Sequence, residues 1–106
     1  MFSRGIRGAI TIEEDNQEML EQATIELYSK MIELNGIKTE DISHIIFTLT
    51  KDIKSAFPAK FVRRNFDVQY VPFICVNEMD IEPSLKHCLR AVSYTHLRAH
   101  ETRHDL

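Results

Sequence analysis

The sequence predicts an α+β domain whose elements follow in the order strand, helix, strand, helix, strand, strand. Between residues 16 and 35, apolar side chains recur at spacings of three and four, which is typical of one long helix with a buried face. Runs of alternating or β-branched residues lie before and after the helical segments and favour strands. At 106 residues the chain forms one domain with much surface for its volume, so oligomerisation would add burial.

Composition excludes several classes of function. A formal net charge of −3 gives no basic surface for a nucleic acid. The two cysteines, Cys75 and Cys88, lack paired metal-ligand spacing and indicate reduced thiols in a cytoplasmic protein. No apolar run approaches the roughly 20 residues of a membrane span, and the first residues lack the hydrophobic region of a signal peptide. We therefore expect a soluble protein that is not exported.

The first strand should run from Phe2 to Ile12. Its apolar residues share one parity, whereas Arg7 lies on the other parity among glycine and alanine. Small neighbours leave room above a long cationic side chain. The face that carries Arg7 is therefore either solvated or part of an anion pocket.

A long helix should follow from about Asn16 to Asn35. Asp15 and Glu18 resemble a capping box at its start, and Gly36 supplies a residue that tolerates left-handed geometry at its end. The predicted buried face consists of Leu20, Ala23, Leu27, Met31 and Leu34.

A short turn at residues 39–42 should lead into a second strand from His44 to Thr50, which is rich in β-branched residues. Pro58 then suits the first position of a second helix that covers Ala59 to Phe66.

Three cations lie on this second helix. Lys60 and Arg63 are three residues apart and share a face, whereas Arg64 points partly away. Such cations usually face solvent, but they could also form the rim of an anion site.

The third strand lies between Gln69 and Asp80, where a run of β-formers ends in a polar cluster. A buried strand that stops on the thiol of Cys75 and the carboxylate of Glu78 would hold polar groups at the edge of a cleft. Alternatively, Cys75 is a small core residue and Glu78 belongs to a solvated turn.

Residues 85–92 should form a fourth strand, with a helix as the less favoured alternative, and either places Arg90 inside an apolar run. A buried guanidinium needs a carboxylate or an anionic ligand, and Glu78 is the candidate partner.

From Ser93 the character of the chain changes, with few large apolar residues and no strand alternation. This segment resembles the translated read-through of a sequencing adaptor. We expect residues 1–92 to form the domain and residues 93–106 to be a non-native tail, foreign to the fold. His96, His100 and His104 have the spacing of a metal-binding stripe on a helix, but we predict no metal site.

Several short motifs, taken as an ordered set over residues 1–92, resemble the small trimeric chorismate mutases of the β-rich class. They are Arg4 to Ala9, Phe57 to Lys60, Tyr70 to Pro72, Cys75, Glu78 to Asp80, and Arg90. The resemblance implies a mixed sheet packed against a long helix in a homotrimeric pseudo-α/β-barrel, with active sites in clefts between subunits. It further implies the rearrangement of chorismate to prephenate in aromatic amino-acid biosynthesis, without a metal or cofactor.

The resemblance also assigns roles. Arg90 would bind the ether oxygen and a carboxylate of the substrate, Arg7 would hold a carboxylate, and Glu78 would accept from the ring hydroxyl with help from Cys75. The remaining residues of the implied substrate site are Phe57, Ala59, Lys60, Arg63, Phe73, Ile74, Val76 and Asn77.

Two departures from the family pattern stand out. Ile74 occupies a position where a small polar residue is expected, and nothing after Val92 matches the family's final strand. A missing strand would leave a sheet edge unpaired and the cleft open on one side. The alternative functions are a non-catalytic small-molecule-binding trimer, an imine deaminase of similar fold, or an inactive truncated copy.

Overall fold

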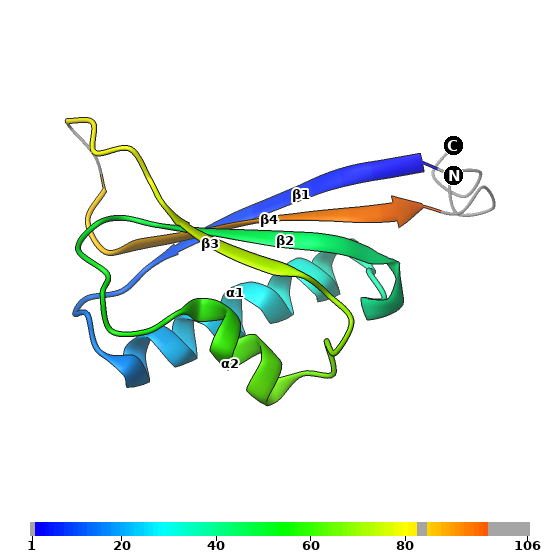
Figure 1. The fold of residues 1–106 in the computed structure, drawn as a ribbon, viewed down its shortest axis with the longest axis horizontal. Coiled ribbons are helices and arrows are strands. Elements are labelled where there is room, and N and C mark those ends of the chain that lie inside the picture. The colour runs from blue at the N-terminus through cyan, green and yellow to red at the C-terminus, as the bar shows by residue number, and fades with distance from the viewer. Residues whose placement is uncertain (1, 83–84, 98–106) are drawn as a thin grey trace.

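The sheet and helices follow in the predicted order. The computed structural model describes residues 2–82 and 85–97. The elements are β1 (Phe2–Thr11), α1 (Gln17–Asn35), the short 3₁₀ helix η1 (Thr39–Asp41), β2 (Ile42–Leu49), α2 (Pro58–Asn65), β3 (Phe73–Asn77) and β4 (Cys88–Leu97). The strand order is β1-β4-β2-β3, with β3 parallel to β2 and the other neighbours antiparallel (Figure 1). The predicted mixed α+β fold is confirmed.

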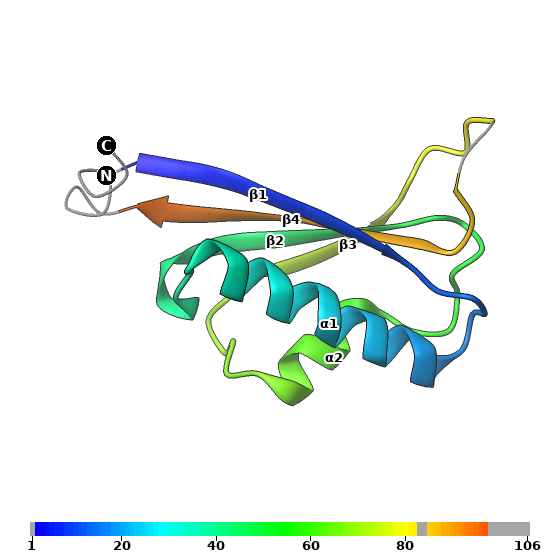
Figure 2. The same ribbon diagram turned by 180° about the vertical axis from the view of Figure 1, so that it is seen from behind.

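Both helices cover the same face of the sheet, as the two opposite views show (Figures 1 and 2). The core lies between these layers and is dominated by Leu20, Ile45, Phe47, Phe61, Val62 and Leu89. In the part of the chain that the structure describes, the other face of the sheet carries no helix, and we call it the open face. Among the same residues, no helix has the length and hydropathy that a membrane span requires.

The long helix ends where the sequence predicts but begins with a different cap. Asn16 is the N-cap, and its side-chain oxygen accepts from the Met19 N–H at 2.8 Å. The predicted capping box of Asp15 and Glu18 is therefore wrong, because Asp15 bonds to a neighbouring loop instead. Gly36 has the expected left-handed geometry, with φ 59°.

Leu34 was predicted to be buried, but it is 82% exposed. Its angular position on α1 is correct, yet it lines an open groove between α1 and β1 instead of meeting the core. Thr24 and Tyr28 complete the buried face of the helix.

The third strand begins later than predicted. Val71 N–H donates to the Val68 carbonyl and closes a turn, and Tyr70 is 88% exposed. Pro72 has no backbone N–H to donate to the neighbouring strand. Its carbonyl accepts from the Ile45 N–H of β2 at 3.1 Å. The strand therefore starts at Phe73.

The fourth strand was predicted to end at Val92, but it continues to Leu97. Ser93 lies opposite Ile6 and Ile45, and the ladders to β1 and β2 continue beyond it. Ser93 and Thr95 face the helices, and Tyr94 and His96 alternate with them. Backbone pairing does not depend on side-chain polarity, so the polar composition concealed the strand. Of the histidine stripe noted in the sequence, His100 and His104 lie outside the described residues.

This continuation places two hydroxyl groups in the core. Ser93 is 2% exposed and Thr95 is 1% exposed, and neither hydroxyl has a hydrogen-bond partner among the described residues. We expect Thr95→Val to raise the free energy of unfolding by about 1 kcal/mol, because it removes an unpaired polar group at constant shape. Urea unfolding measures this change. Thr11→Val, on the exposed part of β1, should have no such effect; a loss of stability in Thr95→Val would contradict the prediction.

Candidate active site

A carboxylate and a guanidinium from neighbouring elements meet on the open face of the sheet. Arg90 Nε lies 2.7 Å from Glu78 Oε1 in an ion pair, which confirms the predicted pairing. Arg90 lies on β4 opposite Thr48 of β2, and Glu78 directly follows β3. The Arg90 side chain is 47% exposed rather than buried as predicted, because no helix covers this face.

The pairing leaves donor and acceptor atoms for a ligand. Thr48 Oγ1 donates to the same Glu78 oxygen, Oε1, at 2.8 Å. Within the described residues, neither Glu78 Oε2 nor the two terminal nitrogens of Arg90 have a hydrogen-bond partner. A guanidinium with free terminal nitrogens can bind a carboxylate or another anionic oxygen, and a free carboxylate oxygen can accept from a hydroxyl.

Arg7 lies on the same sheet face as Arg90. In the antiparallel ladder, Arg7 opposes Val92 and Ala9 opposes Arg90, so the two arginines occupy diagonal positions. Arg7 is exposed and also lines the groove between β1 and α1, whose volume is about 490 Å³. The open face therefore carries two arginines and one carboxylate.

A separate pocket lies between β3 and the start of α2, with a volume of about 450 Å³. Five of the predicted site residues line it, namely Phe57, Lys60, Cys75, Val76 and Asn77. Gln17, Lys54 and Ser55 also line it and were not predicted. Arg7, Glu78 and Arg90 are not among its lining residues. The structure of one chain thus divides the predicted residues into two groups.

The remaining predicted residues lie around these groups. The Arg63 guanidinium stacks over the Phe73 ring at 5.2 Å, on the helix side of β3. Ile74 is 58% exposed. It lies on the same sheet face as Val76, which is the β3 residue opposite Thr48. Ala59 is buried in the core, with 4% exposure.

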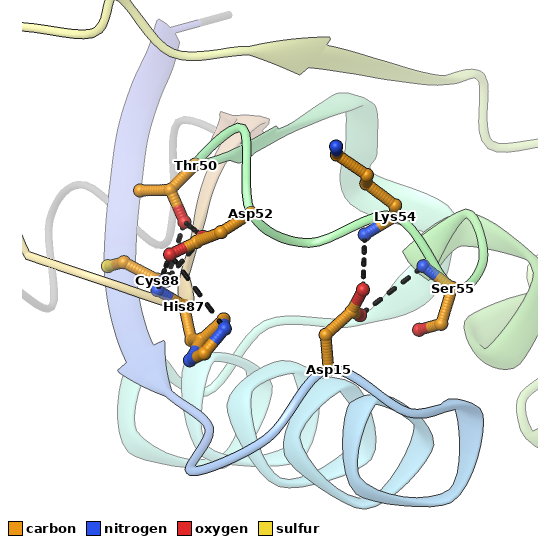
Figure 3. A network of polar contacts seen from close by, with 7 residues as sticks. All are labelled: Asp15, Thr50, Asp52, Lys54, Ser55, His87 and Cys88. Carbon is orange, nitrogen blue, oxygen red and sulfur yellow. Dashed lines mark hydrogen bonds and ion pairs between the residues drawn. The ribbon is translucent and has the colours of Figure 1, made fainter.

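A polar network joins the end of β2 to the start of β4 (Figure 3). The Asp52 carboxylate accepts from the Thr50 hydroxyl and from the His87 N–H, the latter at 3.0 Å. The Thr50 hydroxyl in turn accepts from Cys88 N–H at 2.9 Å. His87 has φ 48°, a left-handed conformation that costs energy in a residue with a side chain. Asp52 therefore stabilises the strained residue that directly precedes β4, three residues before Arg90.

Asp15 links the start of α1 to the loop after β2. Its carboxylate accepts from Lys54 N–H at 2.8 Å and from Ser55 N–H at 3.3 Å (Figure 3). Burial raises the pKa of Asp15, but these hydrogen bonds outweigh it and the pKa lies below its ordinary value. For Asp52, burial likewise raises the pKa, and the bonds from Thr50 and His87 lower it further than burial raises it.

The sequence did not single out Thr48, Thr50 or Asp52. Thr50 donates to Asp52 two residues on, but the other partners of these three residues lie 30 to 38 residues away in the chain, so no local pattern reveals those contacts. The one sequence signal is that Thr48 and Thr50 are hydroxyl residues near the end of an otherwise apolar strand.

Together, two arginines and a carboxylate on the sheet, with a lysine and a thiol in a nearby pocket, define a site for a small anionic molecule that carries a hydroxyl group. The comparison with known proteins agrees with this class of site. The family model described as chorismate mutase type I matches residues 3–105, and the chain belongs to this family.

Individual relatives support the same assignment. The chain is 45% identical over 92 residues to chorismate mutase AroH of Bacillus subtilis (strain 168), which covers 87% of this chain and 72% of that protein. It is 45% identical over 91 residues to chorismate mutase AroH of Thermus thermophilus, covering 85% of this chain and 74% of that protein. The structure of a chorismate mutase from Clostridium thermocellum superposes with a TM-score of 0.83 at 36% identity, covering 87% of this chain and 81% of that one.

Proposed function

We propose that this chain converts chorismate to prephenate at a site built around Arg90 and Glu78. Membership of the chorismate mutase type I family supports the reaction. The observation that carries the choice of site is the Arg90–Glu78 pair. Among the described residues, the terminal nitrogens of Arg90 and Oε2 of Glu78 have no hydrogen-bond partner and can therefore bind a ligand. The match to this family favours a mutase over the imine deaminase.

The chemistry of the rearrangement fits these groups. It is a pericyclic step, in which the ether oxygen of the substrate gains negative charge as its C–O bond breaks. The terminal nitrogens of Arg90 would donate to this oxygen and stabilise the developing charge. Glu78 Oε2 would accept from the ring hydroxyl and hold the ring in its reactive conformation. Arg7, on the same face, would bind a substrate carboxylate.

The pocket beside β3 supplies the other wall of the proposed site. Lys60 adds a cation there, Phe57 adds an apolar surface that is 71% exposed, and Cys75 can contact the hydroxyl of the substrate. Arg63 would lie at the mouth. In this proposal, Ala59, Phe73, Ile74, Val76 and Asn77 shape the surrounding wall or present backbone groups to the ligand.

We propose that the working enzyme is a homotrimer in which each site lies between two subunits. In one chain, none of Arg7, Glu78 and Arg90 on the open face lines the pocket that holds Lys60 and Cys75. A second copy that placed its pocket against the open face would bring them together. The open face also exposes apolar side chains, including Ile74 at 58% and Val76 at 42%, which a neighbouring subunit would bury.

Subunit mixing tests this arrangement. Arg90→Ala damages the open-face group, and Lys60→Glu places a negative charge in the pocket group. Each variant alone should be nearly inactive. After unfolding and joint refolding in equal amounts, mixed trimers should recover about a quarter of the unmodified activity, because a quarter of the interfaces combine two intact halves. No recovery in trimers shown to contain both variants would contradict a site shared between subunits.

Two further proposals concern the chain as a whole. We propose a cytoplasmic protein, since Cys75 and Cys88 are both free thiols. We also propose that the family domain corresponds to residues 1–92 and that residues 93–106 are of non-native origin, although residues 93–97 continue β4. The hydroxyls of Ser93 and Thr95, which have no partner among the described residues, support this second proposal, because such a polar group is costly in the core.

A further inference from the structure

We propose that Thr48 is a positioning residue for the mutase reaction, which acts by fixing the Glu78 carboxylate so that Oε2 faces the substrate. This inference rests on the proposed function and deepens it. Thr48 has no assigned part in the site that the family resemblance implies, and its hydroxyl donates to Glu78.

One oxygen of Glu78 receives both contacts that hold the side chain. Thr48 Oγ1 donates to Oε1 at 2.8 Å, and Arg90 Nε forms an ion pair with the same oxygen at 2.7 Å. A hydrogen bond and an ion pair on one oxygen restrict the rotation of the carboxylate about its terminal bond, which is otherwise broad in glutamate. The other oxygen, Oε2, is thereby directed away from both partners.

The position of Thr48 is itself fixed by the sheet. It opposes Val76 on β3 and Arg90 on β4, so ladders run on both sides of it. The next residue, Leu49, accepts from the Glu78 N–H at 2.8 Å. Two consecutive residues of β2 therefore hold the backbone and the side chain of Glu78.

Without the Thr48 hydroxyl, Arg90 would be the remaining partner of Oε1, and the carboxylate could rotate about the Arg90 contact. Glu78 could then pair both oxygens with Arg90, since a guanidinium offers parallel donors to a carboxylate. Such a pairing would occupy Oε2 and one terminal nitrogen of Arg90 together. The Thr48 hydroxyl thus keeps available the two atoms that the proposed reaction uses.

The test compares Thr48→Val with Thr48→Ser in the full chain, using initial rates of chorismate disappearance. Valine keeps the shape and removes the hydroxyl, and we expect kcat to fall by about tenfold with a smaller change in KM, as for a misplaced catalytic group. Serine restores the donor and should recover kcat to within about twofold. Thr11→Val, an exposed threonine of the same sheet, serves as the control and should leave kcat unchanged.

A double-mutant cycle separates positioning from a general structural effect. In a Glu78→Ala background, Thr48→Val should cause no further loss, because its partner is absent. An equal loss in both backgrounds, or no loss in the unmodified background, would overturn the role of Thr48 while leaving the mutase function intact. If Glu78→Ala alone matches the unmodified chain, Glu78 is not part of the site and the inference fails with that assignment.

Discussion

Replacing Arg90 with alanine is expected to lower kcat/KM for chorismate on the order of a thousandfold, the largest effect we predict for a single substitution. Arg90 is the arginine whose side chain pairs with Glu78 while its terminal nitrogens remain free of partners among the described residues. In the proposed site, its loss would remove the guanidinium beside Glu78 that donates to the ether oxygen as negative charge develops. Initial rates over a range of chorismate concentrations measure the change.

Arg90→Lys is the matched control. Lysine retains the positive charge but cannot donate to Glu78 and to the substrate from one planar group, so we expect a loss of at least about tenfold. Circular dichroism should show that both variants fold. Turnover by Arg90→Ala within a factor of about ten of the unmodified chain would rule out Arg90 as the main electrostatic group.

Replacing Asp52 with alanine is expected to lower the free energy of unfolding by about 2 kcal/mol. The substitution removes the acceptor for the Thr50 hydroxyl and for the His87 N–H. It also withdraws the contact that stabilises His87 in its left-handed conformation. Urea unfolding at neutral pH measures the loss.

The effect of Asp52 should depend on pH in a defined direction. Burial raises its pKa, but the hydrogen bonds from Thr50 and His87 outweigh burial, so the folded pKa lies below the unfolded value of about 3.9. The stabilisation is therefore fully present above the unfolded value and is lost as pH falls through the folded pKa. The difference between the unmodified chain and Asp52→Ala should be constant above about pH 5 and shrink below about pH 4.

Asp80→Ala provides the comparison for Asp52. Asp80 forms an ion pair with Lys51 in which the side chains are 45% and 70% exposed, and such exposed pairs contribute little to stability. A loss in Asp52→Ala no greater than that in Asp80→Ala would show that the network does not stabilise the turn before β4.

Local signals in the sequence predicted most of the fold. Gly36 and Pro58 fix helix boundaries through their own backbone preferences, and both lie where predicted. Local sequence could not decide whether Asp15 or Asn16 caps α1, because the Asp15 carboxylate accepts from the distant backbone N–H groups of Lys54 and Ser55. The continuation of β4 beyond Val92 likewise depends on pairing with two distant strands.

The candidate site was predictable to a similar degree. The pairing of Glu78 with Arg90 followed from the need of a guanidinium for a carboxylate, and the structure confirms it. The separation of Cys75 from Arg90 onto different surfaces could not be predicted, since it follows from strand order and register. Thr48 was missed for the same reason, because its hydroxyl acquires a partner only when β3 and β2 lie side by side.

The measurement that tests the account most directly is the formation of prephenate from chorismate by the unmodified chain. Product should be identified by chromatography, and the rate should be compared with the uncatalysed reaction and with Glu78→Ala. We predict conversion that scales with enzyme concentration and falls on the order of a hundredfold in Glu78→Ala. If the folded chain converts chorismate no faster than the uncatalysed reaction, the proposed function is contradicted. If Glu78→Ala is as fast as the unmodified chain, the site proposed on the open face is contradicted.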